Sequence, residues 1–195
     1  MADAAYKTLD DVFEQVEFFV DAVSDYKSDF ILFPEYFNAP LMAKFNHLGE
    51  AQSIRGLAQY TEEIRERFVN LAISYNINII TGSMPLLKED GALYNVGYLI
   101  RRDGSYEMYE KVHVTPDEQK SWGLSGGKMV KTFDTDCARI GVLICYDVEF
   151  PELSRIMADQ GMQILFVPFL TDTQNGYSRV RVCAQARAIE NECFV

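Results

Sequence analysis

A cysteine at the end of an apolar run is the first residue whose position favours chemistry. Cys145 follows the stretch Ile140–Ile144, and Tyr146 and Asp147 lie between it and a helix that Pro151 is well suited to open. Such a strand-to-helix turn presents a side chain outward, and a nearby helix N-terminus lowers a thiol pKa, which favours the reactive thiolate. A buried, unreactive cysteine fits the same local pattern equally well.

Two charged residues could serve this cysteine. Glu35 follows the apolar segment Phe30–Pro34, so we expect it at the carboxyl edge of a sheet beside Cys145. Partial burial there would raise its pKa toward that of a general base. Lys111 lies late in a predicted strand and needs negative charge nearby if it is half-buried. A capping or salt-bridged glutamate and a solvated lysine remain the simpler interpretations of each residue alone.

Histidine is the usual base for a cysteine nucleophile, and the chain contains two. His113 lies two residues after Lys111, and so on the same face of the predicted strand, which makes a Cys145–His113 dyad an alternative. His47 lies in a loop and has no evident partner. A histidine satisfied within the core or at a sheet edge is the commoner interpretation of His113.

The elements that must position these residues alternate between helix and strand. Apolar spacing predicts helices at residues 12–23 and 64–75, and two more follow at 151–160 and 178–191. Strands are predicted at residues 30–33, 78–81, 93–101, 106–113, 130–133, 139–145, 163–167 and 193–195. The dipeptide Asp103-Gly104 favours a hairpin turn. This pattern indicates mixed α/β layers, with sheets covered on both sides.

Composition excludes several classes of function. The 195 residues, 48% of them hydrophobic, suit an ordinary globular domain, and the net charge of −11 disfavours nucleic acid and anionic lipid as partners. Neither a membrane span nor a secretion signal is recognisable, so we expect a cytoplasmic protein. The four cysteines form no C-x-x-C pair, which makes a zinc site an unfavoured interpretation.

Three segments in chain order resemble the catalytic blocks of the nitrilase superfamily of carbon–nitrogen hydrolases. They are Phe33-Pro34-Glu35, the E-K-x-H pattern at residues 110–113, and G-V-x-I-C-Y-D-x-x-F-P-E at residues 141–152. The segment 185–191 also looks like that family's helix after the nucleophile. The cysteine block is specific, whereas the other two are weak individually, and the resemblance covers essentially the whole chain.

The resemblance implies a fold, a set of site residues and roles for them. The fold would be a four-layer α-β-β-α sandwich, with a catalytic triad of Glu35, Lys111 and Cys145. Glu118 is the best match to a further glutamate that helps to position substrate, although Asp117 is close enough to leave the choice open. The backbone N–H of Tyr146 would join Lys111 in stabilising an oxyanion, and Thr171 would lie in the pocket wall. No metal or organic cofactor is implied.

The implied function is that of an amidase. It would hydrolyse a C–N bond, other than a peptide bond, of a small linear amide or carbamoyl compound through an acyl-enzyme on Cys145. A homodimer or larger homo-oligomer is expected from the family. Two alternatives remain: a nitrilase that acts on true nitriles, and a non-catalytic interaction or regulatory module that keeps the fold.

The sequence departs from the family at both ends. The family domain opens with a strand, whereas Met1–Ala5 stand directly before the first predicted helix, and the strands expected after Val195 are missing. Residues 1–195 are therefore expected to form one incomplete domain, either a fragment of a longer protein or a truncated member. The first helix and the loop from Thr115 to Gly123 resemble a branch in which this domain is fused to an acetyltransferase.

Overall fold

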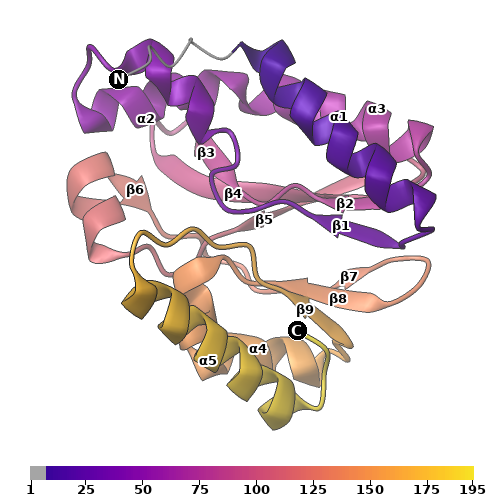
Figure 1. Cartoon of the computed structure of the whole chain (residues 1–195). Helices are drawn as coiled ribbons and strands as arrows, with labels where there is room; N and C mark the ends of the chain where they lie inside the picture. The colour runs from indigo at the N-terminus through magenta and orange to yellow at the C-terminus, as the bar shows by residue number, and fades with distance from the viewer. Residues whose placement is uncertain (1–7) are drawn as a thin grey trace.

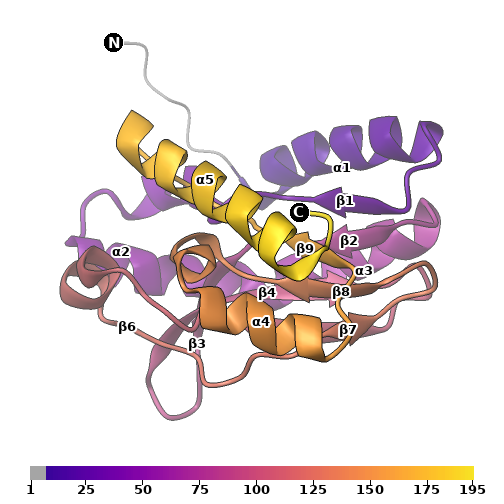
Figure 2. The ribbon, with the colours of Figure 1, turned by 90° about the horizontal axis from the view of Figure 1, so that it is seen from below.

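Two β-sheets lie face to face between outer layers of helices. The computed structural model describes residues 8–195, and Figure 1 shows α1 (Leu9–Asp25) and α3 (Thr61–Ser74) over one sheet. On the other side, α4 (Pro151–Asp159) and α5 (Gln174–Asn191) cover the second sheet (Figures 1 and 2). This arrangement confirms the predicted four-layer α-β-β-α sandwich. The expected absence of an opening strand concerns Met1–Ala5, which lie outside the described residues.

The first sheet is organised around one long strand. Its members are β1 (Phe30–Leu32), β2 (Asn78–Ile80), β3 (Met84–Leu87), β4 (Leu93–Ile100), β5 (Tyr106–Glu110) and β6 (Leu124–Ser125). The strand order is β1-β2-β4-β3, and β5 and β6 also pair with β4. β1 runs parallel to β2, whereas β4 and β5 form the predicted antiparallel hairpin around Asp103 and Gly104.

The second sheet is smaller and carries the nucleophile candidate. It comprises β7 (Phe133–Asp134), β8 (Arg139–Val142) and β9 (Ile164–Phe166). β7 pairs with β8 in the antiparallel sense, and β8 pairs with β9 in the parallel sense. The strand predicted at 193–195 is reduced to a single bridge between Ile164 and Phe194.

Local sequence signals explain where the helices begin. Thr8 caps α1 by accepting a hydrogen bond from the Asp11 N–H at 3.1 Å, while the Asp11 carboxylate accepts one from the Thr8 N–H. Thr173 caps α5 through the Gly176 N–H at 3.0 Å, and Pro151 occupies the first turn of α4. The remaining regular helix is α2 (Glu50–Leu57). Within residues 8–195, no helix combines the length and apolar character needed to cross a membrane.

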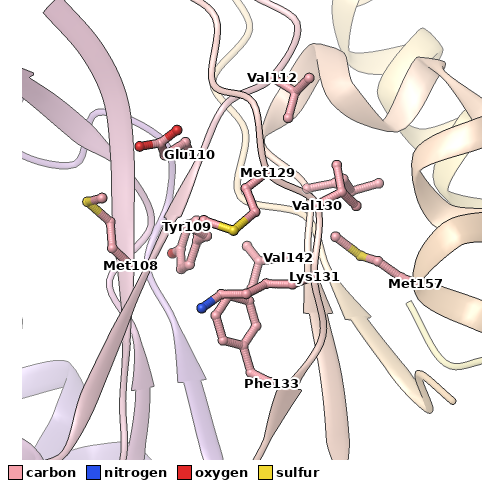
Figure 3. Close-up of a pocket in the computed structure, with 11 residues that line it drawn as sticks. Met108, Tyr109, Glu110, Val112, Met129, Val130, Lys131, Phe133, Val142 and Met157 are labelled. Carbon is pink, nitrogen blue, oxygen red and sulfur yellow. The ribbon is translucent and has the colours of Figure 1, made fainter. Parts of the chain in front are cut away.

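Apolar side chains between the sheets hold the sandwich together. Tyr109 of β5 meets Phe133 of β7 edge to face, with ring centroids 6.3 Å apart, and Val142 of β8 lies in the same buried cluster. Figure 3 shows these side chains around a cavity of only about 30 Å³, with Met129 and Met157 also pointing toward it. Close packing here fixes the two sheets relative to each other, and therefore the residues that follow their strands.

Two strands end earlier than predicted, and both endings matter for the site. β5 ends at Glu110 rather than at His113, and β8 ends at Val142 rather than at Cys145. The Cys145 N–H instead donates to the Pro168 carbonyl oxygen at 2.9 Å, in the loop after β9. Lys111 and Cys145 consequently lie just beyond their sheets, where side chains from different strands converge.

Candidate active site

Cys145 stands on a tight turn at the end of the second sheet. It is the first residue of the 3-10 helix Cys145–Glu149, and its φ of +49° is in the left-handed region that non-glycine residues rarely occupy. Such a conformation costs on the order of 1–3 kcal/mol and must be imposed by its surroundings. The hydrogen bond from the Cys145 N–H to the Pro168 carbonyl oxygen helps to hold the backbone there. The side chain is thereby presented at a strand-to-helix turn, as predicted.

Glu35 lies just after β1, and each of its carboxylate oxygens has a donor. Oε1 accepts hydrogen bonds from Lys111 Nζ at 2.8 Å and from Asn95 Nδ2 at 2.9 Å. Oε2 accepts one from the Leu170 N–H at 3.1 Å. Burial, at 3% exposure, raises the pKa of Glu35, while the Lys111 charge opposes that shift and Glu118 adds to it. The result is a fixed carboxylate with a greater proton affinity than an exposed glutamate.

Lys111 joins two carboxylates in the interior. Its Nζ donates to Glu35 and to Glu118 at 2.8 Å each, and the residue is 1% exposed. Burial by itself would lower the pKa of Lys111, but the charges of Glu35 and Glu118 outweigh it and raise the pKa above its ordinary value. The side chain therefore stays an ammonium group at neutral pH, held rigidly between its partners.

Glu118, rather than Asp117, completes this buried group. Oε1 of Glu118 accepts from Lys111 and, at 3.1 Å, from the Tyr36 hydroxyl, and Oε2 accepts from the Thr115 N–H at 2.7 Å. Burial, then the negative charge of Glu118, raises the pKa of Tyr36, so the phenol remains a neutral donor. Asp117 is exposed and makes no contact with Lys111. Of the two residues that the sequence left open, Glu118 is therefore the one that contacts Lys111.

The thiol of Cys145 is less acidic than the sequence led us to expect. Burial, and then the negative charge of Glu35, raises its pKa to about 12, with Lys111 acting in the opposite direction. The expected lowering of the thiol pKa is wrong because burial and the charge of Glu35 dominate, and the helix opened by Pro151 begins six residues after Cys145. At neutral pH the resting sulfur is therefore a protonated thiol that requires a base.

The carboxylate of Asp147, which the sequence did not mark as a site residue, bonds to two segments that border the site. Asp147 is 1% exposed and accepts hydrogen bonds from the backbone N–H groups of Val112 (3.2 Å), His113 (2.7 Å) and Ile144 (3.3 Å). It thereby joins the segment after Lys111 to the turn that presents Cys145. The pattern Cys-Tyr-Asp was visible in the sequence, but only the fold shows which N–H groups face it.

His113 is engaged elsewhere and does not pair with the cysteine. Its Nδ1 lies 3.2 Å from Asp147 Oδ1, and its ring stacks on Phe150 with centroids 3.7 Å apart. The predicted shared face with Lys111 is wrong, because β5 ends at Glu110 and the chain turns before His113. The Cys145–His113 dyad is therefore absent from this arrangement.

One cavity of about 360 Å³ contains most of the predicted site. Its walls are Glu35, Tyr36, Lys111, Thr115, Asp117, Glu118, Trp122, Cys145, Leu170, Thr171, Asp172 and Gly176. Thr171 is in the wall, as predicted, and Leu170, Trp122 and Tyr36 are lining residues that the sequence did not mark. Tyr146 is not among them: its ring packs edge to face on Phe150. As the second residue of a helix, its N–H has no acceptor inside that helix.

The chemistry of the cavity is that of a thiol, a fixed carboxylate and a fixed ammonium group. Cys145 Sγ lies 3.8 Å from the Leu170 carbonyl oxygen, and the Leu170 N–H holds Glu35, so one residue of the loop contacts both. Within residues 8–195, no three His, Cys, Asp or Glu side chains are grouped as metal ligands. A base beside a nucleophile, with a cation in reach of the developing charge, is an arrangement for covalent attack on a carbonyl carbon.

Comparison with known proteins identifies the family. The carbon-nitrogen hydrolase family model matches residues 3–195. The chain is 49% identical over 180 residues to the probable hydrolase YhcX of Bacillus subtilis, covering 92% of this chain and 35% of that protein. It is 33% identical over 175 residues to the omega-amidase NIT2 of Homo sapiens, covering 83% of this chain and 59% of that protein.

A solved structure agrees with this assignment. Nit3 of Saccharomyces cerevisiae, a member of branch 10 of the nitrilase superfamily, superposes with a TM-score of 0.74 and 26% identity, over 92% of this chain and 66% of that chain. The chain spans less than two thirds of the length of both curated relatives, 35% of one and 59% of the other. The chain belongs to the carbon–nitrogen hydrolase family.

Proposed function

We propose that this chain carries the catalytic centre of an amidase, which hydrolyses a C–N bond of a small linear amide or carbamoyl compound through an acyl-enzyme on Cys145. The observation that carries the proposal is the buried chain of contacts from Lys111 to Glu35, in the same cavity as a strained cysteine. The likeness to a relative named as an amidase supports the choice of amides.

In the proposed first half-reaction, Glu35 takes the thiol proton while Cys145 Sγ bonds to the amide carbon. The raised pKa values of both groups suit this step, since the thiol is protonated at rest and the carboxylate binds a proton firmly. Lys111 and the Tyr146 N–H would stabilise the oxyanion. Glu35 then passes the proton to the nitrogen, the C–N bond breaks, and the amine leaves.

In the second half-reaction, water replaces the amine. Glu35 takes a proton from the water while the water oxygen attacks the thioester carbon. The C–S bond then breaks, Glu35 returns the proton to Cys145 Sγ, and the carboxylic acid leaves. Glu118 contacts Lys111 and would keep the ammonium group oriented through both halves. Metal ions and organic cofactors take no part in this scheme.

Intact-mass spectrometry tests the proposal directly. Brief incubation with a panel of amides, carbamoyl compounds and nitriles should give an adduct of the mass of the acyl group, lost in Cys145→Ala. Cys137→Ala is the matched control, because Cys137 is an exposed cysteine outside the cavity and its removal should leave the adduct unchanged.

The Glu35→Gln variant separates the two half-reactions. Loss of the Glu35 charge, with Lys111 still present, lowers the pKa of the Cys145 thiol and makes it easier to ionise without a base. A p-nitrophenyl ester of the same acid has a leaving group that needs no proton, so this variant should still acylate but release the acyl group far more slowly, because no base activates water. Turnover of nitriles in preference to amides would replace the amidase by a nitrilase. Absence of any adduct on Cys145 would favour a non-catalytic module that keeps the fold.

A further inference from the structure

The cavity around Cys145 has a buried floor and an exposed rim. Cys145, Glu35 and Lys111 are buried at the floor, and Glu118 is buried beside them. The ammonium group of Lys111 is already shared by two carboxylates. No other lysine or arginine is among the described residues that line the cavity, so its walls offer an anion no free cationic side chain.

The rim carries two more carboxylates, and neither is engaged. Asp117 precedes the short helix Glu118–Trp122 without capping it, and Asp172 lies in the loop before α5. Both side chains are exposed and line the cavity. Among residues 8–195, neither carboxylate has a hydrogen bond or an ion pair with another side chain.

Two aromatic side chains also line the cavity. Trp122 and Tyr36 both line the cavity, and their rings meet edge to face with centroids 5.5 Å apart. Tyr36 is buried and Trp122 is half-buried. Aromatic faces attract cations and tolerate alkyl chains, but they give no favourable contact to a carboxylate.

We infer that the cavity takes an amide or carbamoyl compound whose far end carries a protonated amine, with the C–N bond at Cys145 and the amine near Asp117 and Asp172. This inference rests on the proposed function and adds the substrate class. A substrate with a terminal carboxylate would meet four carboxylates and one neutralised lysine, which is unfavourable in a partly water-excluded site. The net charge of −11 also attracts cations toward the molecule.

Three amides with five carbon atoms each form the test. δ-Aminovaleramide, valeramide and glutaramate differ only in their far end, which is cationic, neutral and anionic, respectively. At low ionic strength, kcat/KM should be highest for δ-aminovaleramide and at least about tenfold lower for glutaramate. The preference should shrink as salt is added, since the rim charges are exposed to solvent.

Two substitutions and a control assign the preference to the rim. Asp117→Asn and Asp172→Asn should each lower kcat/KM for δ-aminovaleramide by about threefold to fivefold, while valeramide changes by less than about twofold. Asp159→Asn removes the same charge from an exposed position at the end of α4, outside the cavity, and should change neither. If Asp117 and Asp172 serve only the fold, all three amides will respond equally.

Binding to the Cys145→Ala variant, measured by calorimetry, separates this inference from the proposed function. Tighter binding of δ-aminovaleramide without turnover by the unaltered protein would support the cation preference and refute the amidase. Turnover of all three amides at equal rates, or of glutaramate fastest, would refute the cation preference and leave the amidase in place. Binding of none of them, with no adduct on Cys145, would refute both.

Discussion

At the scale of single residues, the charge of Glu118 bears directly on the proposed base. Burial is the largest cause of the raised pKa of Glu35, and the negative charge of Glu118 raises it further. In Glu118→Gln this repulsion is lost, and Lys111 is left with Glu35 as its remaining charged partner. Both changes favour ionised Glu35, so its pKa should fall.

The expected result is a shift of the acid limb of the pH profile of kcat/KM to lower pH in Glu118→Gln. This limb reports protonation of the base in the free enzyme, and a lower pKa keeps Glu35 ionised further into acid. Glu152→Gln, on the exposed face of α4, is the control and should leave the limb in place. A limb that moves to higher pH would contradict the proposed charge interaction.

A second residue-scale prediction concerns Asp147. In Asp147→Asn one carboxylate oxygen becomes an NH₂ group, which faces backbone N–H donors and leaves a buried donor unpaired. We expect a loss of about 1–3 kcal/mol in the free energy of unfolding, together with reduced kcat, because the Lys111 segment loses its link to the Cys145 turn. Urea denaturation measures the first and steady-state kinetics the second.

Asp159→Asn is the matched control for this substitution. The same chemical change at an exposed carboxylate with no partner among the described residues should alter stability by less than about 0.5 kcal/mol. Equal stability losses in the two variants would show that the buried hydrogen bonds of Asp147 contribute nothing particular.

The residues that meet in the cavity were predictable where they follow recognisable strands. Glu35 and Cys145 were found at strand ends and Lys111 late in a strand, whereas Glu118 was only the best match to a further glutamate of the resembled family. Asn95 and Asp147 were missed. Asn95 lies inside a predicted strand, so the sequence gives no sign of a role in the site. Its hydrogen bond to Glu35 joins positions 60 residues apart. Such partners follow from strand pairing, which single-sequence patterns do not specify.

At the scale of elements, β4 lies so close to the chain at Gly82 and to the Tyr109 ring of β5 that one position excludes a side chain. A Cβ on Gly97 of β4 would lie 2.1 Å from the Gly82 carbonyl oxygen and 2.5 Å from the Tyr109 ring. The Tyr109 hydroxyl donates to that same oxygen at 2.6 Å, so the ring cannot move away without losing this bond.

Gly97→Ala should therefore lower the free energy of unfolding by about 1–3 kcal/mol, as expected for overpacking in a closed interior. Thermal or urea denaturation would measure it. Gly49→Ala, where nothing lies within 4 Å of the added Cβ, should cost less than about 1 kcal/mol. Equal stability of Gly97→Ala and the unaltered protein would contradict this close packing around Gly97.

Most elements were predictable from the sequence, and the missed ones have identifiable causes. β3 contains Pro85, which argues against a strand, yet β3 pairs with β4 alone, an edge position where proline is tolerated. α2 contains Gly56, and its N-cap residue Gly49 provides no side-chain cap. The ends of β5 and β8 were misplaced because apolar runs continue into buried loops, and hydrophobicity alone does not distinguish the two.

At the scale of the whole molecule, α5 exposes two apolar side chains on one face. Val182 and Ile189, seven residues apart on this helix, are 61% and 79% exposed. We propose this face as the contact of the expected homodimer, since exposed apolar patches often mark protein interfaces.

Ile189→Lys should weaken that dimer. Ile189 is 79% exposed, so the substitution should leave the fold intact while placing a charge in the interface. Sedimentation velocity over a range of concentrations should show a shift toward monomer. Ile73→Lys on α3, 53% exposed, is the control on the opposite layer. An unaltered protein that is monomeric at every concentration would refute the proposal.

The bond between Leu170 and Glu35 has a consequence for how the molecule forms. It joins residues 135 positions apart and links the loop after β9 to the end of β1, so it requires both sheets to be docked. Contacts this distant in sequence form late, because the entropy of closing the intervening chain must be met first. During refolding, helices and the β4–β5 hairpin can arise locally, but the base and the thiol come together only when the two sheets close. Catalytic competence should therefore be the last property that the refolding chain acquires.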